Sequence, residues 1–406
     1  IRHIIYWLEQ AKNVAENSQQ QLVIDLLIRY YRTGDLHLFD EYSIEWLKEQ
    51  DGNVDFINGF IEVYGDPLGI KASWEGIVEY KDLEATRRTR LISDNAQWFE
   101  DHSPVDQRFK KDVVRGVTAN VVCAAMLGGD EYPSTAIGIN LPNADWIRAQ
   151  HGSKSVTISN ITDAYNKAAK DNGFKEEFVI DAETLNMVSL YGDICDDLHT
   201  DLHECLGHGS GQLLPGVSPD ALKAYGNTIE EARADLFGLY YMADEKLLEL
   251  GLLPDKDAFH SQYYTYMMNG LMTQLTRIEQ GKDIEEAHMR NRALIAHWVL
   301  DHGKGAVELV KHEGKTYVRI NNYGQLRHLF GELLAEVQRI KVDGTLHAEV
   351  LERFAKLDIA PYKGFINPVY KLIYNSQGDI VDVEVDYSEA YDAQMLRYSS
   401  EFGFLV

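Results

Sequence analysis

Two histidines in a run of six residues restrict how the middle of this chain can fold. Residues 203–208 read His-Glu-Cys-Leu-Gly-His, within a segment, about 171–350, whose periodicity is mainly helical. On a regular α-helix, positions i and i+4 share a face, whereas position i+5 lies well off it. Both imidazoles can therefore reach one point only if the helix is locally widened, as in a π-type turn. Gly207 tolerates such a distortion.

Two converging imidazoles would suit a zinc ion, which prefers nitrogen ligands in a tetrahedral site. Glu204, beside the first histidine, could then take a proton from an activated water, as the glutamate of an HExxH motif does. The alternative is that His203 and His208 are unrelated helix histidines, because short strings of this kind also arise by chance.

A catalytic zinc site needs a third protein ligand. Residues 230–235 read Glu-Glu-Ala-Arg-Ala-Asp and stand near the start of a further helical pattern, so Glu231 could close the site. Thr228 and Glu231 also have the spacing of a capping box, in which Glu231 would only cap its own helix. Glu230 would then be a first-turn carboxylate favoured by the helix dipole. The residues alone leave both interpretations open.

Periodicity elsewhere predicts an α+β protein. Residues 1–50 read as helical, with a break at Gly34 and Asp35, and residues 81–125 also read as helical. Short strand-like runs occur at 60–64 and 136–141, and a hairpin is expected from 372–374 and 381–387.

These patterns predict two lobes, of which the sheet-bearing one is assembled from discontinuous pieces of the chain. One lobe is mainly helical and carries the candidate zinc ligands, and the other is mixed, with a small β-barrel or sheet. We expect the mixed lobe to comprise residues 1–82, 124–169 and 360–406, and the helical lobe residues 83–123 and 170–359.

Charge and composition exclude several partners. The net charge of −25 repels nucleic acid and anionic lipid, whereas it attracts a cation such as the ammonium end of a peptide. The acidic surface could also serve solubility alone. The three cysteines, at an odd count and without metal-ligand spacing, do not indicate a disulfide framework. No apolar run is long enough for a membrane span, and we expect a cytoplasmic protein. The chain opens within a helical pattern, so we expect the C-terminal part of a longer polypeptide.

Several motifs together resemble the dipeptidyl peptidase III family, whose members carry HExxGH followed by EExRA(E/D). The matching strings are HECLGHGSG at 203–211 and EEARAD at 230–235. Further similar strings, in the family's order, are FIEVYGDPLG at 60–69, GINLPN at 138–143 and EAHMRNR at 286–292. The form HECLGH resembles the bacterial branch, close to the Bacteroides enzyme.

This resemblance implies a zinc peptidase that removes dipeptides from the N-terminus of oligopeptides, with an active-site cleft between the two lobes. By it, the zinc ligands are His203, His208 and Glu231, and Glu204 is the general base and acid. Glu230 would orient a ligand imidazole. Asp235 stands where many relatives have Glu, which leaves a similar role for it open.

The resemblance also implies substrate contacts. Glu62, Asn140 and Asn143 would hold the free amino end of the peptide, since carboxylate and amide oxygens can accept its three ammonium hydrogens. Tyr64 and His288 would stabilise the oxyanion, and Arg292 would lie near the substrate. By residue type alone, Tyr64 would be an ordinary strand aromatic and His288 a surface helix histidine.

Relatives carry a further N-terminal segment, a possible partner of this chain. Two other functions stay open: a zinc aminopeptidase or endopeptidase of other specificity, and an inactive peptide-binding module that retains zinc. The second is disfavoured because Glu204 is present and because structural zinc sites usually have four protein ligands.

Overall fold

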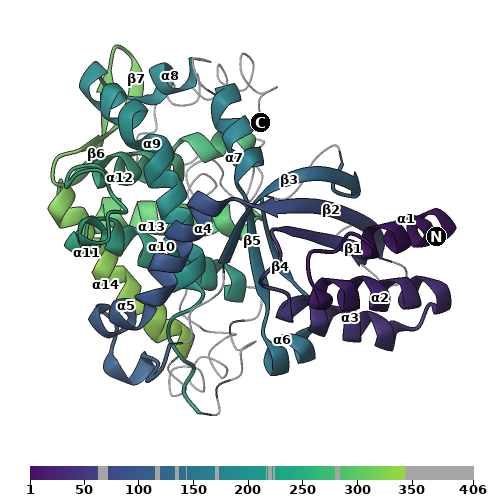
Figure 1. The fold of residues 1–406 in the computed structure, drawn as a ribbon. Coiled ribbons are helices and arrows are strands. Elements are labelled where there is room, and N and C mark those ends of the chain that lie inside the picture. Colours follow the sequence, from purple (N-terminus) through teal and green to yellow (C-terminus); the bar gives the residue numbers. More distant parts are fainter. Residues whose placement is uncertain are drawn as a thin grey trace, which may run out of the picture. The chain divides into compact units, whose positions relative to one another are not determined.

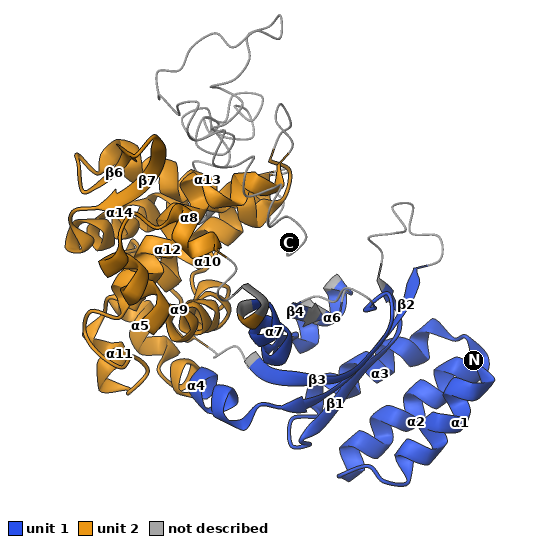
Figure 2. Ribbon diagram, turned by 90° about the horizontal axis from the view of Figure 1, so that it is seen from above, with its two compact units in different colours: residues 1–90, 117–165 blue, residues 91–116, 166–406 orange. Residues whose placement is uncertain are grey.

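The computed structural model describes residues 1–62, 72–114, 119–132, 137–142, 144–169, 173–215, 217, 222, 225–278 and 284–342. Contacts within the chain divide it into two compact units (Figure 2). Unit 1 comprises Ile1–Arg90 and Val117–Tyr165, and unit 2 comprises Leu91–Gly116 and Asn166–Val406. The expected hairpin at 372–374 and 381–387, and the whole of 360–406, lie outside the described residues.

Unit 1 begins with three helices, α1 (Arg2–Lys12), α2 (Ser18–Thr33) and α3 (Leu36–Lys48), which lie next to one another beside strand β1 (Figure 1). They confirm the helical prediction for residues 1–50. Gly34 ends α2 with a φ of 73°, a left-handed conformation that glycine adopts easily. The Asp35 side chain then accepts a hydrogen bond from the His37 N–H and caps α3. The expected break therefore has a physical basis at both residues.

The sheet of unit 1 has five strands in the order β1-β2-β3-β5-β4. Only β3 and β5 are parallel; the other pairs are antiparallel. The described strands form an open sheet, so the expectation of a small sheet is right and that of a closed barrel is wrong. Their bounds are β1 Val54–Glu62, β2 Ser73–Lys81, β3 Ala119–Gly129, β4 Gly138–Leu141 and β5 Lys154–Ile158.

Strand β3 corrects the helical prediction for residues 81–125. Helices α4 (Leu83–Asp94) and α5 (Ala96–His102) are present, but residues from Ala119 onward form a strand between β2 and β5. The run of apolar residues after Asn120 is short, and periodicity cannot separate a short buried strand from a helix. Residues 117–123 accordingly belong to unit 1, whereas the expected domain boundaries placed them in the helical lobe. The remaining helices of this region are η1 Gln107–Phe109, α6 Asp145–His151 and α7 Ser159–Ala169.

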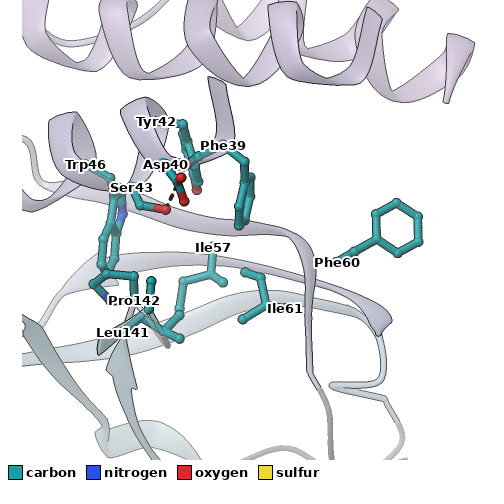
Figure 3. A pocket seen from close by; sticks show the side chains of 11 residues that line it. Phe39, Asp40, Tyr42, Ser43, Trp46, Ile57, Phe60, Ile61, Leu141 and Pro142 are labelled. Atoms are coloured by element: carbon teal, nitrogen blue, oxygen red, sulfur yellow. Dashed lines mark hydrogen bonds between the residues drawn. The ribbon is translucent and has the colours of Figure 1, made fainter. Parts of the chain in front are cut away.

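A pocket of about 160 Å³ lies between α3 and the sheet of unit 1 (Figure 3). Its lining comes from α3, from β1 and from the end of β4, although β1 and β4 are the opposite edges in the strand order. The sheet must therefore curve so that both edges approach α3. The lining is mostly apolar and comprises Phe39, Asp40, Tyr42, Ser43, Trp46, Ile57, Phe60, Ile61, Leu141, Pro142 and Ala144.

The carboxyl group of Glu79 is buried in unit 1 without a hydrogen-bond partner among the described residues. Glu79, on β2, is 0% exposed, and neither of its side-chain oxygens accepts a hydrogen bond from the described residues. Burial, reinforced by the charge of Asp55, raises its pKa to about 8, although Lys154 acts in the opposite direction. Glu79 is therefore largely protonated at neutral pH in the folded chain.

Unit 2 is mainly helical, as predicted, and its central helix is α10 (Gly226–Met242), which is buried along most of its length. It packs against α9 (Ala182–Leu202), α12 (Phe259–Leu271), α13 (Ala287–His302) and α14 (Tyr323–Val342). A hairpin of β6 (Val307–His312) and β7 (Lys315–Ile320) was not predicted. The shorter helices are α8 Phe174–Phe178, α11 Glu245–Glu249 and η4 Thr273–Arg277.

The widened turn predicted from the histidine spacing is present. Helix α9 continues into a π-helical turn, η2 (His203–Gly207), and the N–H of His208 bonds to the carbonyl of His203 at 3.1 Å. Gly207 lies in this turn, as expected, and has a further role. A β-carbon at this position would lie 2.5 Å from Ala234 Cα and 2.6 Å from Ala234 Cβ. Glycine is thus required by the close approach of α10.

We expect the substitution Gly207→Ala to destabilise the chain by about 1–3 kcal/mol, because the added methyl group overlaps the backbone of α10. Gly192→Ala, within α9, is the control: its β-carbon would meet only Ser261 Oγ, at 3.9 Å. This control should gain roughly 0.5–1 kcal/mol from helix propensity. Urea unfolding of both variants checks the prediction, and equal effects would contradict it.

We expect stability to fall as the pH rises from about 4.5 to about 8, because Glu79 holds a proton over this range only in the folded chain. Glu79→Gln keeps the shape of the protonated group and should flatten this dependence, with a gain on the order of 3 kcal/mol at pH 8. Urea midpoints measured from pH 5 to 8 test this, with exposed Glu84→Gln as the control. A variant curve parallel to that of the parent would refute the assignment.

Candidate metal centre

Two helices of unit 2 bring three side chains to one point. His203 and His208 come from the widened turn and the residue after it, and Glu231 comes from α10. One potential ligand atom from each of these residues lies within 4.8 Å of the other two. Glu231 Oε2 is 3.2 Å from His203 Nε2 and 3.7 Å from His208 Nε2. This clustering is the one predicted from the two motifs.

The three residues fit a tetrahedral metal ion. Ligand atoms about 2.0–2.1 Å from a tetrahedral zinc ion lie roughly 3.3 Å from one another, close to the spacing around Oε2. Glu231 Oε2 is buried, yet it accepts no well-aligned hydrogen bond from any described residue. A buried carboxylate oxygen that faces two imidazole nitrogens without a hydrogen bond suits a cation between them.

Two further carboxylates fix the orientation of the imidazoles. His203 Nδ1 is 2.7 Å from Asp235 Oδ1, and His208 Nδ1 is 2.9 Å from Glu230 Oε1. Because a carboxylate accepts, each Nδ1 carries a proton, and each Nε2 is the nitrogen directed toward Glu231. Carboxylate–histidine pairs of this kind are usual around protein-bound zinc. Asp235 thus makes the contact that the sequence left open.

Charge and burial act differently on the two histidines. Burial lowers the pKa of His203, but its hydrogen bond to Asp235 and the nearby Glu231 carboxylate outweigh this effect and raise the value to about 10. Burial and the neighbouring His203 lower the pKa of His208 to about 4. Burial would raise the pKa of Asp235, but its bond to His203 holds the pKa far below its usual range. The metal-free site therefore retains a proton on His203, which a cation would displace.

The Arg233 side chain contacts both Glu230 and the loop that follows His208. The Arg233 guanidinium is 2% exposed and donates to both Glu230 oxygens, at 2.7 and 3.2 Å. It also donates to the backbone oxygen and hydroxyl of Ser210, in the loop that follows His208. This bridge ties the loop to α10 and balances the charge of Glu230.

Three other predicted residues lie around the cluster. Glu204 is half-buried in the widened turn, and its charge acts on both ligand histidines. His288, on α13, is 48% exposed, and its Nδ1 lies 3.3 Å from Glu231 Oε2. Arg292 is one turn further along α13 and acts electrostatically on Asp235. A titratable base and a polar side chain open to solvent thus adjoin the three candidate ligands.

Four of the predicted substrate contacts lie in unit 1 or outside the described residues. Glu62 ends β1, and Asn140 lies within β4. Tyr64 and Asn143 are not among the described residues. Whether these four residues approach the metal centre stays a prediction.

The capping-box interpretation of Glu231 is wrong. Helix α10 begins at Gly226, after Tyr225, so Thr228 and Glu231 both lie inside the helix. Cys205 is also not a ligand in this arrangement: it is 0% exposed, and burial raises the pKa of its thiol to about 12, as expected for an unreactive cysteine.

Sequence reasoning missed the residues that surround Asp235. Tyr266 on α12 and Asn291 on α13 both donate to Asp235 Oδ2, and His199 contacts its backbone oxygen. They come from three different helices, so no local spacing connects them. Asn291 stands within EAHMRNR, but nothing in that string indicates which way its side chain points.

Comparison with protein-family models gives a match to "Peptidase family M49" over residues 1–223 and 219–344. Similar curated proteins include dipeptidyl peptidase 3 of Homo sapiens, 23% identical over all of this chain and 60% of the relative, and that of Nematostella vectensis, 24% identical over 77% of this chain. The chain therefore spans only part of these relatives, 60% of the length of the human protein and 46% of that of the Nematostella protein.

Two solved structures share the fold. That of DPP III from Caldithrix abyssi has a TM-score of 0.69 and 24% identity, covering 90% of this chain and 68% of that one. The structure of dipeptidyl-peptidase III from a Corallococcus strain has a TM-score of 0.63 and 21% identity, covering 97% and 69%. Among the described residues, no helix has the length and apolar character to cross a membrane. Because the family model matches most of the sequence, the chain belongs to peptidase family M49.

Proposed function

We propose that this chain carries the metal centre of a zinc peptidase that removes dipeptides from the N-terminus of oligopeptides. The observation that carries the proposal is the cluster of His203, His208 and Glu231, with a buried Glu231 oxygen left for a cation. Membership of family M49 and similarity to dipeptidyl peptidase 3 supply the reaction class.

The candidate ligands would hold zinc through two imidazole nitrogens and one carboxylate oxygen. When bound, zinc supplies a Lewis acid that acidifies a water molecule and polarises the scissile carbonyl. Glu204 accepts the proton of the attacking water and later delivers it to the leaving amine. His288, beside Glu231 and half-exposed, donates to the oxyanion, and Tyr64 assists.

The substrate's amino end would be held by Glu62, Asn140 and Asn143, and Arg292 would contact the rest of the peptide. A fixed distance between the ammonium site and the scissile bond would make the enzyme count two residues. The acidic surface, with a net charge of −25, favours an approaching cationic peptide end. The same proposal includes a cleft between two lobes, a cytoplasmic location and a place in the bacterial branch, close to the Bacteroides enzyme.

We expect Glu204→Gln to lower kcat for a dipeptidyl-naphthylamide by about 10²–10⁴-fold, because the base is lost while the three candidate ligands are unchanged. Metal content, measured on the same samples, should not change. Glu183→Gln, an exposed residue in the first turn of α9, is the matched control and should behave as the parent.

Three other results would redirect the proposal. A parent chain that binds zinc without cleaving would favour the peptide-binding module, or a requirement for a further segment of the protein. Release of single residues or internal fragments would favour an aminopeptidase or endopeptidase. A parent chain that binds no zinc would contradict the proposal.

We expect Glu62→Gln to lower kcat/KM about 10–100-fold for peptides with a free amino end, because a charge-assisted hydrogen bond to the ammonium group is lost. The metal content should stay at the parental value. Assays with matched peptides, one with a free amino end and one N-acetylated, test this. The parent and Glu62→Gln should have the same kcat/KM for the acetylated peptide, which has no ammonium group. A uniform loss on both peptides would argue against an ammonium site at Glu62.

A further inference from the structure

Asp235 is held by a set of hydrogen bonds from three helices. Its Oδ1 accepts from His203 Nδ1 at 2.7 Å. Its Oδ2 accepts from the Tyr266 hydroxyl at 2.7 Å and from Asn291 Nδ2 at 3.0 Å. Asp235, Tyr266 and Asn291 are 6%, 5% and 0% exposed, so water does not compete effectively for these bonds.

The two carboxylates that orient the histidines are compensated in different ways. Glu230 receives two hydrogen bonds from the Arg233 guanidinium, so its negative charge is largely balanced. The Oδ2 donors of Asp235 are a neutral hydroxyl and a neutral amide. Arg292 and His199 act on Asp235 electrostatically. The negative charge of Asp235 is therefore directed mainly at His203.

We propose that Tyr266 and Asn291 are positioning residues that hold Asp235 against His203 and thereby make His203 the stronger nitrogen donor of the metal centre. With Oδ2 occupied by two donors, the carboxylate presents Oδ1 to Nδ1 and cannot rotate away. The imidazole then keeps its proton on Nδ1 and its Nε2 lone pair toward the metal. This inference rests on the proposed metal site.

The orientation of Asn291 supports this role. Rotation of its amide by a half-turn would place Oδ1 against the carboxylate of Asp235, where two acceptors repel each other. Only the orientation with Nδ2 toward Asp235 Oδ2 gives a hydrogen bond. Asn291 is fully buried, so water does not compete with Asp235 for the hydrogen bond that Nδ2 donates.

The test measures the dissociation constant for Zn²⁺ by competition with a chelator, on the full chain. We expect Tyr266→Phe and Asn291→Ser each to weaken binding about tenfold, the lower end for groups that support a metal ligand. With Co²⁺ as a spectroscopic probe, both variants should also shift the visible absorption bands, because the donor strength of His203 changes.

Tyr263→Phe is the matched control. Tyr263 lies on the same helix, is 0% exposed and donates one hydrogen bond, to the Leu239 carbonyl of α10, at 2.7 Å. It should lose a similar amount of stability in the metal-free state without any change in Zn²⁺ affinity or in the Co²⁺ spectrum. This comparison separates positioning of the ligand from a general packing role.

The outcomes discriminate between the two proposals. A parent chain that binds Zn²⁺, with variants that bind it equally well, overturns the positioning role and leaves the metal site standing. A parent chain that binds no Zn²⁺ overturns both. If Tyr266→Phe does not fold, Asn291→Ser gives the answer alone, since it acts on the same carboxylate oxygen.

Discussion

The contact between the widened turn at His203–Gly207 and helix α10 is the constraint on which the candidate metal centre depends. Gly207 lies so close to Ala234 that a β-carbon would overlap the helix backbone. Gly238 makes a similar approach to His199, on the preceding turn of α9. Because the two helices touch at these points, carboxylates on α10 reach imidazoles on α9 and η2. The π-type turn then supplies the rotation that aligns His208 with His203.

The charges around this contact are arranged in pairs. Each candidate histidine ligand donates from Nδ1 to a carboxylate of α10, which leaves Nε2 for the metal. Glu231 stands between the two imidazoles, with a buried oxygen that the protein itself leaves without a well-aligned hydrogen bond. Burying so many charges is unfavourable without compensation, and Arg233 together with a bound cation would provide it. The same part of α10 thus packs against the widened turn and provides the carboxylates of the candidate metal centre.

The sheet-bearing unit has a separate physical character. Its core is apolar and includes Ile57, Ile77 and Trp46, yet it buries the carboxyl group of Glu79 without a hydrogen bond. Its sheet curves so that strands at opposite edges line one pocket against α3. A proposed ammonium site at Glu62 and Asn140 would lie on the strands that form these edges.

The sequence by itself predicted the widened turn, because the spacing of His203 and His208 admits no regular helix if both bind one ion. It left Glu231 open between a ligand and a helix cap, and only the resemblance to a family selected it as a ligand. It also determined the helices at 1–50 and the helical character of unit 2, through apolar periodicity. It could not separate the strand at 119–129 from a helix, since a short apolar run carries no usable period. Only the tertiary structure decided that Glu231 is not a cap, that Gly207 is needed for contact with Ala234, and that Tyr266 and Asn291 hold Asp235. Those contacts join residues from different helices, and the distances between helices are set by packing across the whole unit, which no local pattern encodes.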